Sequence, residues 1–204
     1  MRRKLGIVCI LLGIACILAS LGWMGYNRLD EQNAAHTADV IRENVKEQIE
    51  KLPSEEGKQE QEVWPQEMPT MQTDGYDCIG VLSIPVLALE LPVLTDWSYE
   101  KLKAAPCLYH GNYHEADFVI AAHNYTSHFG RISRLQPQDL IFFTDVNGVV
   151  RCYEVILIET LPADATKEMI TSGFDLSLYT CTLGRGSRVT VRCNAVGNQM
   201  QRND

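Results

Sequence analysis

The feature that most restricts the fold of this chain is an uncharged segment near its N-terminus. Residues 5–27 contain no Asp, Glu, Lys or Arg and are mostly apolar. About 20 such residues in a helix span the roughly 30 Å of hydrocarbon in a bilayer. Three basic residues at positions 2–4 precede the segment, and Trp23 and Tyr26 lie near its end. By the positive-inside rule this pattern predicts a transmembrane helix with a cytoplasmic N-terminus.

We expect residues 5–27 to be a retained signal anchor, with residues 1–4 in the cytoplasm and the rest of the chain outside the cell. A cleaved signal peptide is an alternative, but its apolar region is usually about 7 to 15 residues long and ends in an A-x-A-like site. Residues 17–19, ILA, match that site poorly. A lipoprotein signal ending at Cys16 is a second alternative, although a glycine stands where a large aliphatic residue is expected.

Residues 28–75 are predicted to form a helical stalk followed by a flexible linker. Within residues 29–52, apolar side chains recur at three- and four-residue spacing among Glu, Lys and Gln, namely Ile41, Val45, Ile49 and Leu52. This is the pattern of an amphipathic helix, and Pro53 is expected to end it. Residues 54–72 are rich in Glu, Gln and Pro, so we interpret them as a tether that buries too little apolar surface to fold.

Residues 76–204 have the pattern of an all-β domain, with short Val-, Ile- and Leu-rich runs separated by Gly, Pro, Asn and Asp. Strands are predicted at residues 79–84, 88–94, 117–122, 140–144, 149–160, 176–181 and 187–193. Short helical turns are predicted at residues 98–105, 129–135 and 166–171. Asn147-Gly148 favours a hairpin turn. About seven strands in roughly 130 residues indicate a barrel or a sandwich.

Charge and cysteine content narrow the function. The net charge of −8 makes nucleic acid an unsuitable partner. Seven cysteines are present, and five of them follow the predicted anchor. Outside a cell thiols can pair, but an odd number leaves at least one free or joined to another molecule. The sequence does not determine the disulfide state of four of them, Cys78, Cys107, Cys152 and Cys193.

One cysteine is predicted to lie opposite an arginine. Residues 176–181 form a predicted strand that ends at Cys181, a glycine-rich loop follows, and Arg188 opens the next strand. Antiparallel pairing then places thiol and guanidinium side by side, whereas Arg192 lies about 13 Å further along at roughly 3.3 Å per residue. A neighbouring cation favours the nucleophilic thiolate. Cys181 is therefore the candidate nucleophile, and a buried inert thiol is the alternative.

A cysteine nucleophile needs a proton donor for its leaving group, and histidine titrates in the useful range. His123 follows an apolar strand and precedes a loop that opens with Asn124. His128, in the same loop, is the reserve candidate. The other three histidines are expected in the stalk and in a solvated loop, namely His36, His110 and His114.

These segments resemble the sortase family. Residues 177–181, SLYTC, are similar to the sortase Thr-Leu-x-Thr-Cys signature, and residues 119–124, VIAAHN, resemble the strand that carries the sortase histidine. Arg188, followed by VTV, is similar to the arginine that opens the last strand of the family. Two further segments resemble it as well, residues 79–85 and 129–135. The resemblance covers residues 76–194.

The resemblance implies a closed β-barrel of about seven to eight strands and a cysteine transpeptidase activity. It implies that Cys181 attacks a threonine carbonyl in a C-terminal sorting motif and that His123 is the general acid and base. It also implies that Arg188 stabilises the oxyanion or holds the substrate backbone. We expect Thr180, Thr182 and Asn124, which adjoin the nucleophile and the histidine, to contact the substrate. Residues 159–175 correspond to the segment in which sortases set motif specificity.

The partners implied are surface proteins or pilins that carry the sorting motif, with an amine of a cell-wall precursor or a pilin lysine as acceptor. The sequence does not choose between these acceptors, nor between a class B-like and a class D-like subclass. It departs from the family at Ser177 and in the short interval between Cys181 and Arg188, so Arg185 is an alternative arginine. No cofactor and no metal are expected, because three candidate carboxylates lack calcium-loop spacing, namely Asp139, Asp145 and Glu159.

Two other functions use the same features. A cell-wall cysteine peptidase or amidase would pass the acyl group to water instead of to an amine. A non-enzymatic anchored β-domain would use Cys181 and His123 only as core residues, and its thiol would be unreactive near neutral pH.

Overall fold

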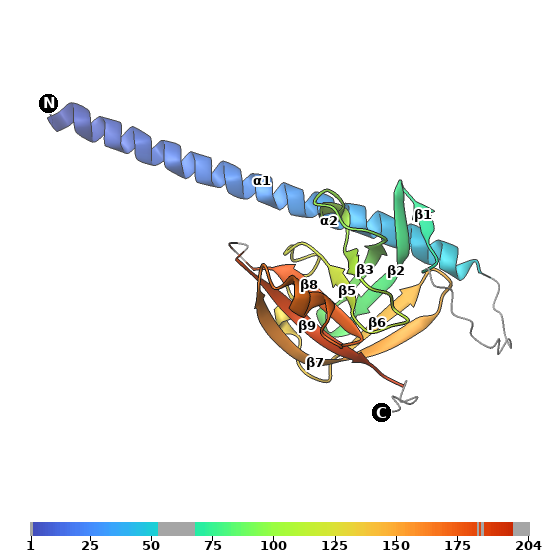
Figure 1. The fold of residues 1–204 in the computed structure, drawn as a ribbon. Helices are drawn as coiled ribbons and strands as arrows, with labels where there is room; N and C mark the ends of the chain where they lie inside the picture. The colour runs from blue at the N-terminus through green and yellow to red at the C-terminus, as the bar shows by residue number, and fades with distance from the viewer. Residues whose placement is uncertain (1, 53–67, 183, 185, 198–204) are drawn as a thin grey trace.

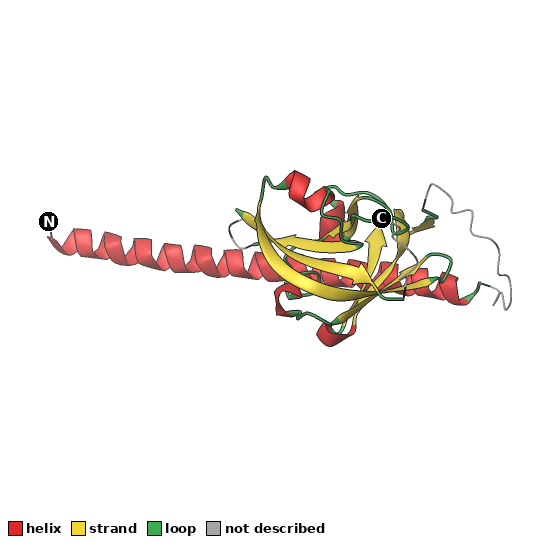
Figure 2. Ribbon diagram, turned by 60° about the horizontal axis from the view of Figure 1, so that its bottom comes forward, coloured by secondary structure: helices red, strands yellow, loops and turns green. Residues whose placement is uncertain are grey.

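The computed structural model describes residues 2–52, 68–182, 184 and 186–197. A long helix, α1 (Arg2–Glu50), lies with its C-terminal half along a β-barrel and projects beyond it at its N-terminal half (Figures 1 and 2). The described strands are β1 (Met71–Thr73), β2 (Tyr76–Ile84), β3 (Leu89–Leu94), β4 (Cys107–His110), β5 (Phe118–Ala121), β6 (Leu140–Asp145), β7 (Val150–Pro162), β8 (Leu176–Cys181) and β9 (Ser187–Ala195). The short helices are η1 (Pro85–Leu87), α2 (Lys101–Ala104), η2 (Ile132–Arg134) and α3 (Thr166–Ile170).

The barrel closes through a pairing between β2 and β6. The strand order is β1-β2-β3-β4-β5-β8-β9-β7-β6, and β2 pairs with β6 in addition. Strands β2 to β9 therefore form the closed ring, and β1 extends one edge as a hairpin with β2. Gly80 is needed at the closure, because a Cβ there would clash with the carbonyl oxygen of Thr144. The predicted closed barrel of about seven to eight strands is confirmed.

The strands alternate between an inner and an outer face, as the two-residue period of a strand requires. On β5 and β8 the inward side chains of Phe118, Ile120 and Leu178 join the main core. The outward side chains of Ala121 and Tyr179 pack under α3 in a second, smaller cluster. The outer face of β5 and β8 is thus partly covered, and this matters for the candidate site.

The C-terminal half of α1 belongs to the folded body. The amphipathic pattern predicted for residues 29–52 is present, and its stripe packs against the barrel through Ala34, Ala38, Ile41 and Val45, none of which is more than 4% exposed. Burying an Ile or Val side chain contributes about 1.5 to 3 kcal/mol. Of the described helices, α1 contains the stretch that is long and apolar enough to cross a membrane, as judged by length and composition.

Most predicted elements are present, but two strands were missed. All seven predicted strands and all three predicted helical turns have counterparts. The short strands β1 and β4 lack a run of alternating residues long enough to show the strand period. The tether predicted for residues 54–72 lies mostly outside the described residues, and the prediction is wrong at its end, because Met68 packs on the core and Met71 pairs with Cys78.

Candidate active site

Three adjacent strands bring the candidate catalytic residues to one rim of the barrel. On the antiparallel pair β8 and β9, Cys181 is the direct partner of Arg188. On the parallel pair β5 and β8, Ala121 is the partner of Tyr179, and the Ala122 N–H donates to the Tyr179 carbonyl at 3.1 Å. Strand β5 ends at Ala121, two residues before His123, and β8 ends at Cys181, two residues after Tyr179, so both candidate residues lie at the same end of neighbouring strands.

The three side chains differ in their access to solvent. Cys181 is exposed, whereas His123 and Arg188 are half-buried. Positions 177, 179 and 181 alternate to the outer face of β8, so the thiol lies on the outside of the barrel and at its rim. A peptide can therefore reach the sulfur without any opening of the core.

Arg188 is held by an aromatic ring and has a spare donor. Its Cζ lies 5.1 Å from the ring centroid of Tyr179, within the range of a cation–π contact. Its Nη1 is buried and has no hydrogen-bond partner among the described residues. A buried donor left unpaired costs about 1 to 3 kcal/mol. An acceptor atom supplied by a substrate would remove that cost.

The threonines on either side of Cys181 are engaged within the protein. The Thr180 hydroxyl is buried and donates to the Ala122 carbonyl at 2.9 Å, which ties the end of β8 to the residue before His123. The Thr182 N–H donates to the Ser187 carbonyl at 2.9 Å and so closes the hairpin. Asn124 is exposed. Substrate contact by these three residues stays a prediction. The two threonines hold the end of β8 in place through the hydrogen bonds above.

A row of aromatic rings leads away from Arg188 along the outer surface. The ring centroids of Tyr179 and Tyr109 are 5.2 Å apart, and those of Tyr109 and Trp97 are 5.7 Å apart. Tyr99 adds an exposed ring 5.9 Å from Trp97. Sequence reasoning missed this row, because its members come from separate segments and only the barrel brings them together.

Arg192 fastens the segment between β7 and β8 to the barrel. Its guanidinium is 2% exposed and donates to Glu159 Oε1, Ser177 Oγ and the Glu168 carbonyl, each at 2.8 Å. Glu168 and the buried Met169 belong to α3, so the arginine holds this helix over the outer face of β8. Sequence reasoning set Arg192 aside as too distant from Cys181. The structure gives it this bracing contact instead.

The reserve histidine is not at the rim. His128 is fully buried, and neither ring nitrogen has a hydrogen-bond partner of standard geometry among the described residues. Burial, followed by the charge of nearby His123, lowers the pKa of His128 to about 4. It is therefore neutral near pH 7 and has no route to solvent for proton exchange with a substrate.

The other cysteines beyond α1 are less exposed to solvent than Cys181. The five cysteines that follow α1 are free. Burial raises the pKa of Cys78, Cys107 and Cys193 to about 12. Cys152 is half-buried on β7, and burial raises its pKa as well.

The carboxylates considered for calcium are engaged elsewhere. Asp145 is buried and bonded to Arg151 at 3.0 Å. Asp139 caps the turn at Gln136, and Glu159 pairs with Arg192.

Comparison with known proteins agrees with the barrel fold. Residues 82–196 match the family model described as the sortase domain. Among solved structures, a sortase C from Clostridium perfringens SM101 superposes with a TM-score of 0.52 at 22% identity, covering 59% of this chain and 70% of that one. A sortase A from Corynebacterium diphtheriae gives 0.54 at 22% identity over 63% and 64%. Sortase C1 from Streptococcus agalactiae gives 0.54 at 24% identity over 63% and 72%. No curated protein matches the chain.

Proposed function

Since the chain belongs to the sortase family, we propose that it is a membrane-anchored cysteine transpeptidase in which Cys181 is the nucleophile and His123 the general acid and base. Arg188 stabilises the oxyanion. The observation that supports this assignment is the order of the neighbouring strands β5, β8 and β9. Cys181 of β8 pairs with Arg188 of β9, and His123 follows β5, which pairs with the other edge of β8.

In the first half-reaction the Cys181 thiolate attacks the carbonyl carbon of a threonine in the sorting motif. The carbonyl oxygen becomes an oxyanion, which accepts a hydrogen bond from Arg188. Preorganised donors of this kind are worth about 3 to 4 kcal/mol each. As the C–N bond breaks, the His123 imidazolium gives its proton to the departing amine, and a thioester to Cys181 remains.

In the second half-reaction an acceptor amine attacks the thioester carbonyl, and neutral His123 takes its proton. Collapse of the intermediate forms the new amide bond and releases the Cys181 thiolate. One histidine serves both steps because each half-reaction leaves it in the state that the other needs. No external oxidant, reductant or cofactor enters the balance.

The substrates proposed are surface proteins or pilins with a C-terminal sorting motif, and the acceptor is an amine of the cell-wall precursor or a pilin lysine. Anchoring by residues 5–27, with the barrel outside the cell, brings both substrates within reach. Asp30, the first α1 residue to bond the loop after His123, lies three residues beyond this segment. At 1.5 Å per residue that is about 4.5 Å of helix, so the catalytic rim is at the membrane surface.

Mass spectrometry of the full chain in detergent tests the proposal. The protein is incubated with a library of threonine-containing sorting peptides, with and without triglycine as acceptor. We expect a Cys181-linked acyl mass and a triglycine adduct that identifies the motif. Hydrolysis with no diversion to triglycine would favour the peptidase alternative. Absence of both products from a folded protein would contradict the proposed substrate class.

We expect Arg188→Ala to lower kcat for acyl transfer by about 10²- to 10³-fold, the usual cost of losing one oxyanion donor. Arg188→Lys keeps the charge but not the planar fork, so it should restore only part of the rate. Steady-state kinetics with the identified peptide measures both. Arg185→Ala is the matched comparison, since Arg185 is the alternative arginine. Arg185 lies outside the described residues. A larger loss in that variant would reassign the role.

A further inference from the structure

The loop that follows His123 is bonded to the membrane-proximal part of α1. The Tyr125 hydroxyl donates to Asp30 Oδ2 at 2.6 Å, and the Thr126 N–H donates to Glu31 Oε1 at 2.6 Å. Bonds to carboxylates at this length are charge-assisted and about twice as strong as neutral ones. These two bonds join segments 95 residues apart in the chain.

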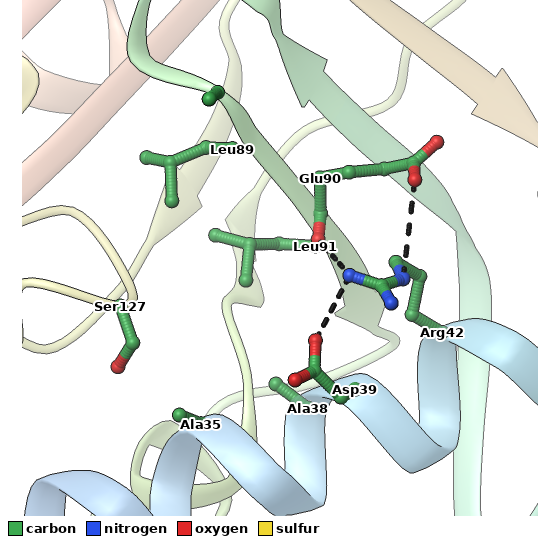
Figure 3. A pocket seen from close by; sticks show the side chains of 9 residues that line it. Ala35, Ala38, Asp39, Arg42, Leu89, Glu90, Leu91 and Ser127 are labelled. Carbon is green, nitrogen blue, oxygen red and sulfur yellow. Dashed lines mark hydrogen bonds and ion pairs between the residues drawn. The ribbon is translucent and has the colours of Figure 1, made fainter.

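The helix is held beside this loop by independent contacts, so the loop docks on a fixed partner. Further along α1, Arg42 donates to the Glu90 carbonyl of β3 at 3.5 Å, and Lys46 pairs with the Glu90 carboxylate at 3.0 Å. Between these contacts and the loop lies a small pocket of about 120 Å³, which Ala35 of the helix and Ser127 of the loop border (Figure 3). None of the candidate catalytic residues lines it.

Tyr125 is the centre of the loop. Its carbonyl accepts hydrogen bonds from the His128 and Gly130 N–H groups at 3.0 and 2.8 Å, and the Phe129 N–H returns to the His123 carbonyl at 3.2 Å. The loop is therefore a closed turn that starts and ends at the catalytic histidine. Movement of Tyr125 would be passed to the backbone of His123.

The Tyr125 ring also touches the imidazole itself. Its centroid lies 5.0 Å from that of His123 and 5.4 Å from that of buried His128. His123 therefore packs against a ring whose hydroxyl is tied to α1. Neutral His128 also packs against that ring and adds no charge near pH 7.

We propose that Tyr125 is a positioning residue for His123, and that Asp30 of α1 holds Tyr125 in place. The inference rests on the proposed role of His123 as general acid. It makes the membrane-proximal turn of α1 a part of the active site, in addition to its use as an anchor. A 1 Å displacement of a catalytic group can cost about 100-fold in rate, so a side chain that fixes the imidazole has a measurable effect.

A double-mutant cycle on the full chain in detergent tests the coupling. We expect Tyr125→Phe and Asp30→Ala each to lower kcat for transfer from the amide substrate by about 10-fold or more, with KM for the peptide little changed. The double variant should be no slower than either single variant, because both remove the same bond. Asp39→Ala is the control, since this carboxylate is on the same helix and pairs with Arg42 of that helix, not with the loop, among the described residues.

A second substrate distinguishes a loss of general-acid positioning from a disruption of the whole active site. An ester whose leaving group departs without a proton needs no general acid, so the variants should process it at close to the wild-type rate. Equal losses on amide and ester, or independent losses in the double variant, would overturn the proposal. Wild-type kinetics in the two single variants would overturn it too and leave the transpeptidase assignment intact, whereas an inactive wild-type protein would refute that assignment itself.

Discussion

Replacing Cys181 by alanine should abolish the acyl-enzyme mass and lower kcat/KM for transfer by at least about 10⁴-fold, the scale on which loss of a catalytic nucleophile acts. The physical reason is that the thioester cannot form without the sulfur. Cys181→Ser should also be nearly inactive, because a serine hydroxyl beside His123 is a far weaker nucleophile than a thiolate. Intact-mass analysis and steady-state kinetics with the identified peptide measure both effects.

The matched control for this prediction is Cys152→Ala. Cys152 is half-buried on β7, outside the three strands that carry the candidate residues. We expect its kcat/KM to stay within about twofold of wild type, as for other substitutions away from a site. An acyl mass that persists in Cys181→Ala and disappears in Cys152→Ala would contradict the proposed nucleophile.

The sequence predicts the strand that ends at Cys181, and its partner, closely. Strand β8 begins and ends where its pattern indicates, at Leu176 and Cys181. The same pattern also indicates the pairing of Cys181 with Arg188, because a single hairpin joins them and few registers are open to a short loop. Local information of this kind suffices when the partners are close in the chain.

Contacts between distant segments could not be predicted in the same way. The aromatic row next to Arg188 and the bond from Tyr125 to Asp30 depend on how the barrel closes and where α1 lies against it. The periodicity of residues 29–52 shows that one helix face is apolar, but it does not show what covers that face. From its sequence the helix is therefore predicted to be a stalk, whereas in the structure it packs against β3 and the His123 loop.

Arg192 is another residue whose role needs the whole fold, and it has the largest predicted effect on stability. Its sequence position indicates only an arginine in a strand. In the structure it is a buried cation that bonds a carboxylate, a buried hydroxyl and the backbone of α3. Its partner Glu159 keeps 37% of its side chain exposed, so this carboxylate can regain water when the arginine is removed. Ser177 is fully buried and cannot.

We therefore expect Arg192→Met to lower the free energy of unfolding by about 3 kcal/mol. Hydrogen bonds to charged groups contribute roughly 1.5 to 3 kcal/mol each. Hydration of Glu159 in the variant offsets only part of their loss. Methionine roughly keeps the volume, so the loss reports the bonds rather than a cavity. Urea unfolding in detergent, followed by tryptophan fluorescence, measures the effect. The exposed arginine at position 134 provides the control, and Arg134→Met should change stability by less than about 0.5 kcal/mol.

In folded Arg192→Met, α3 loses the hydrogen bonds that hold it over β8, so KM for the sorting peptide should rise more than kcat falls. Equal stability of the two variants would show that Arg192 does not brace α3.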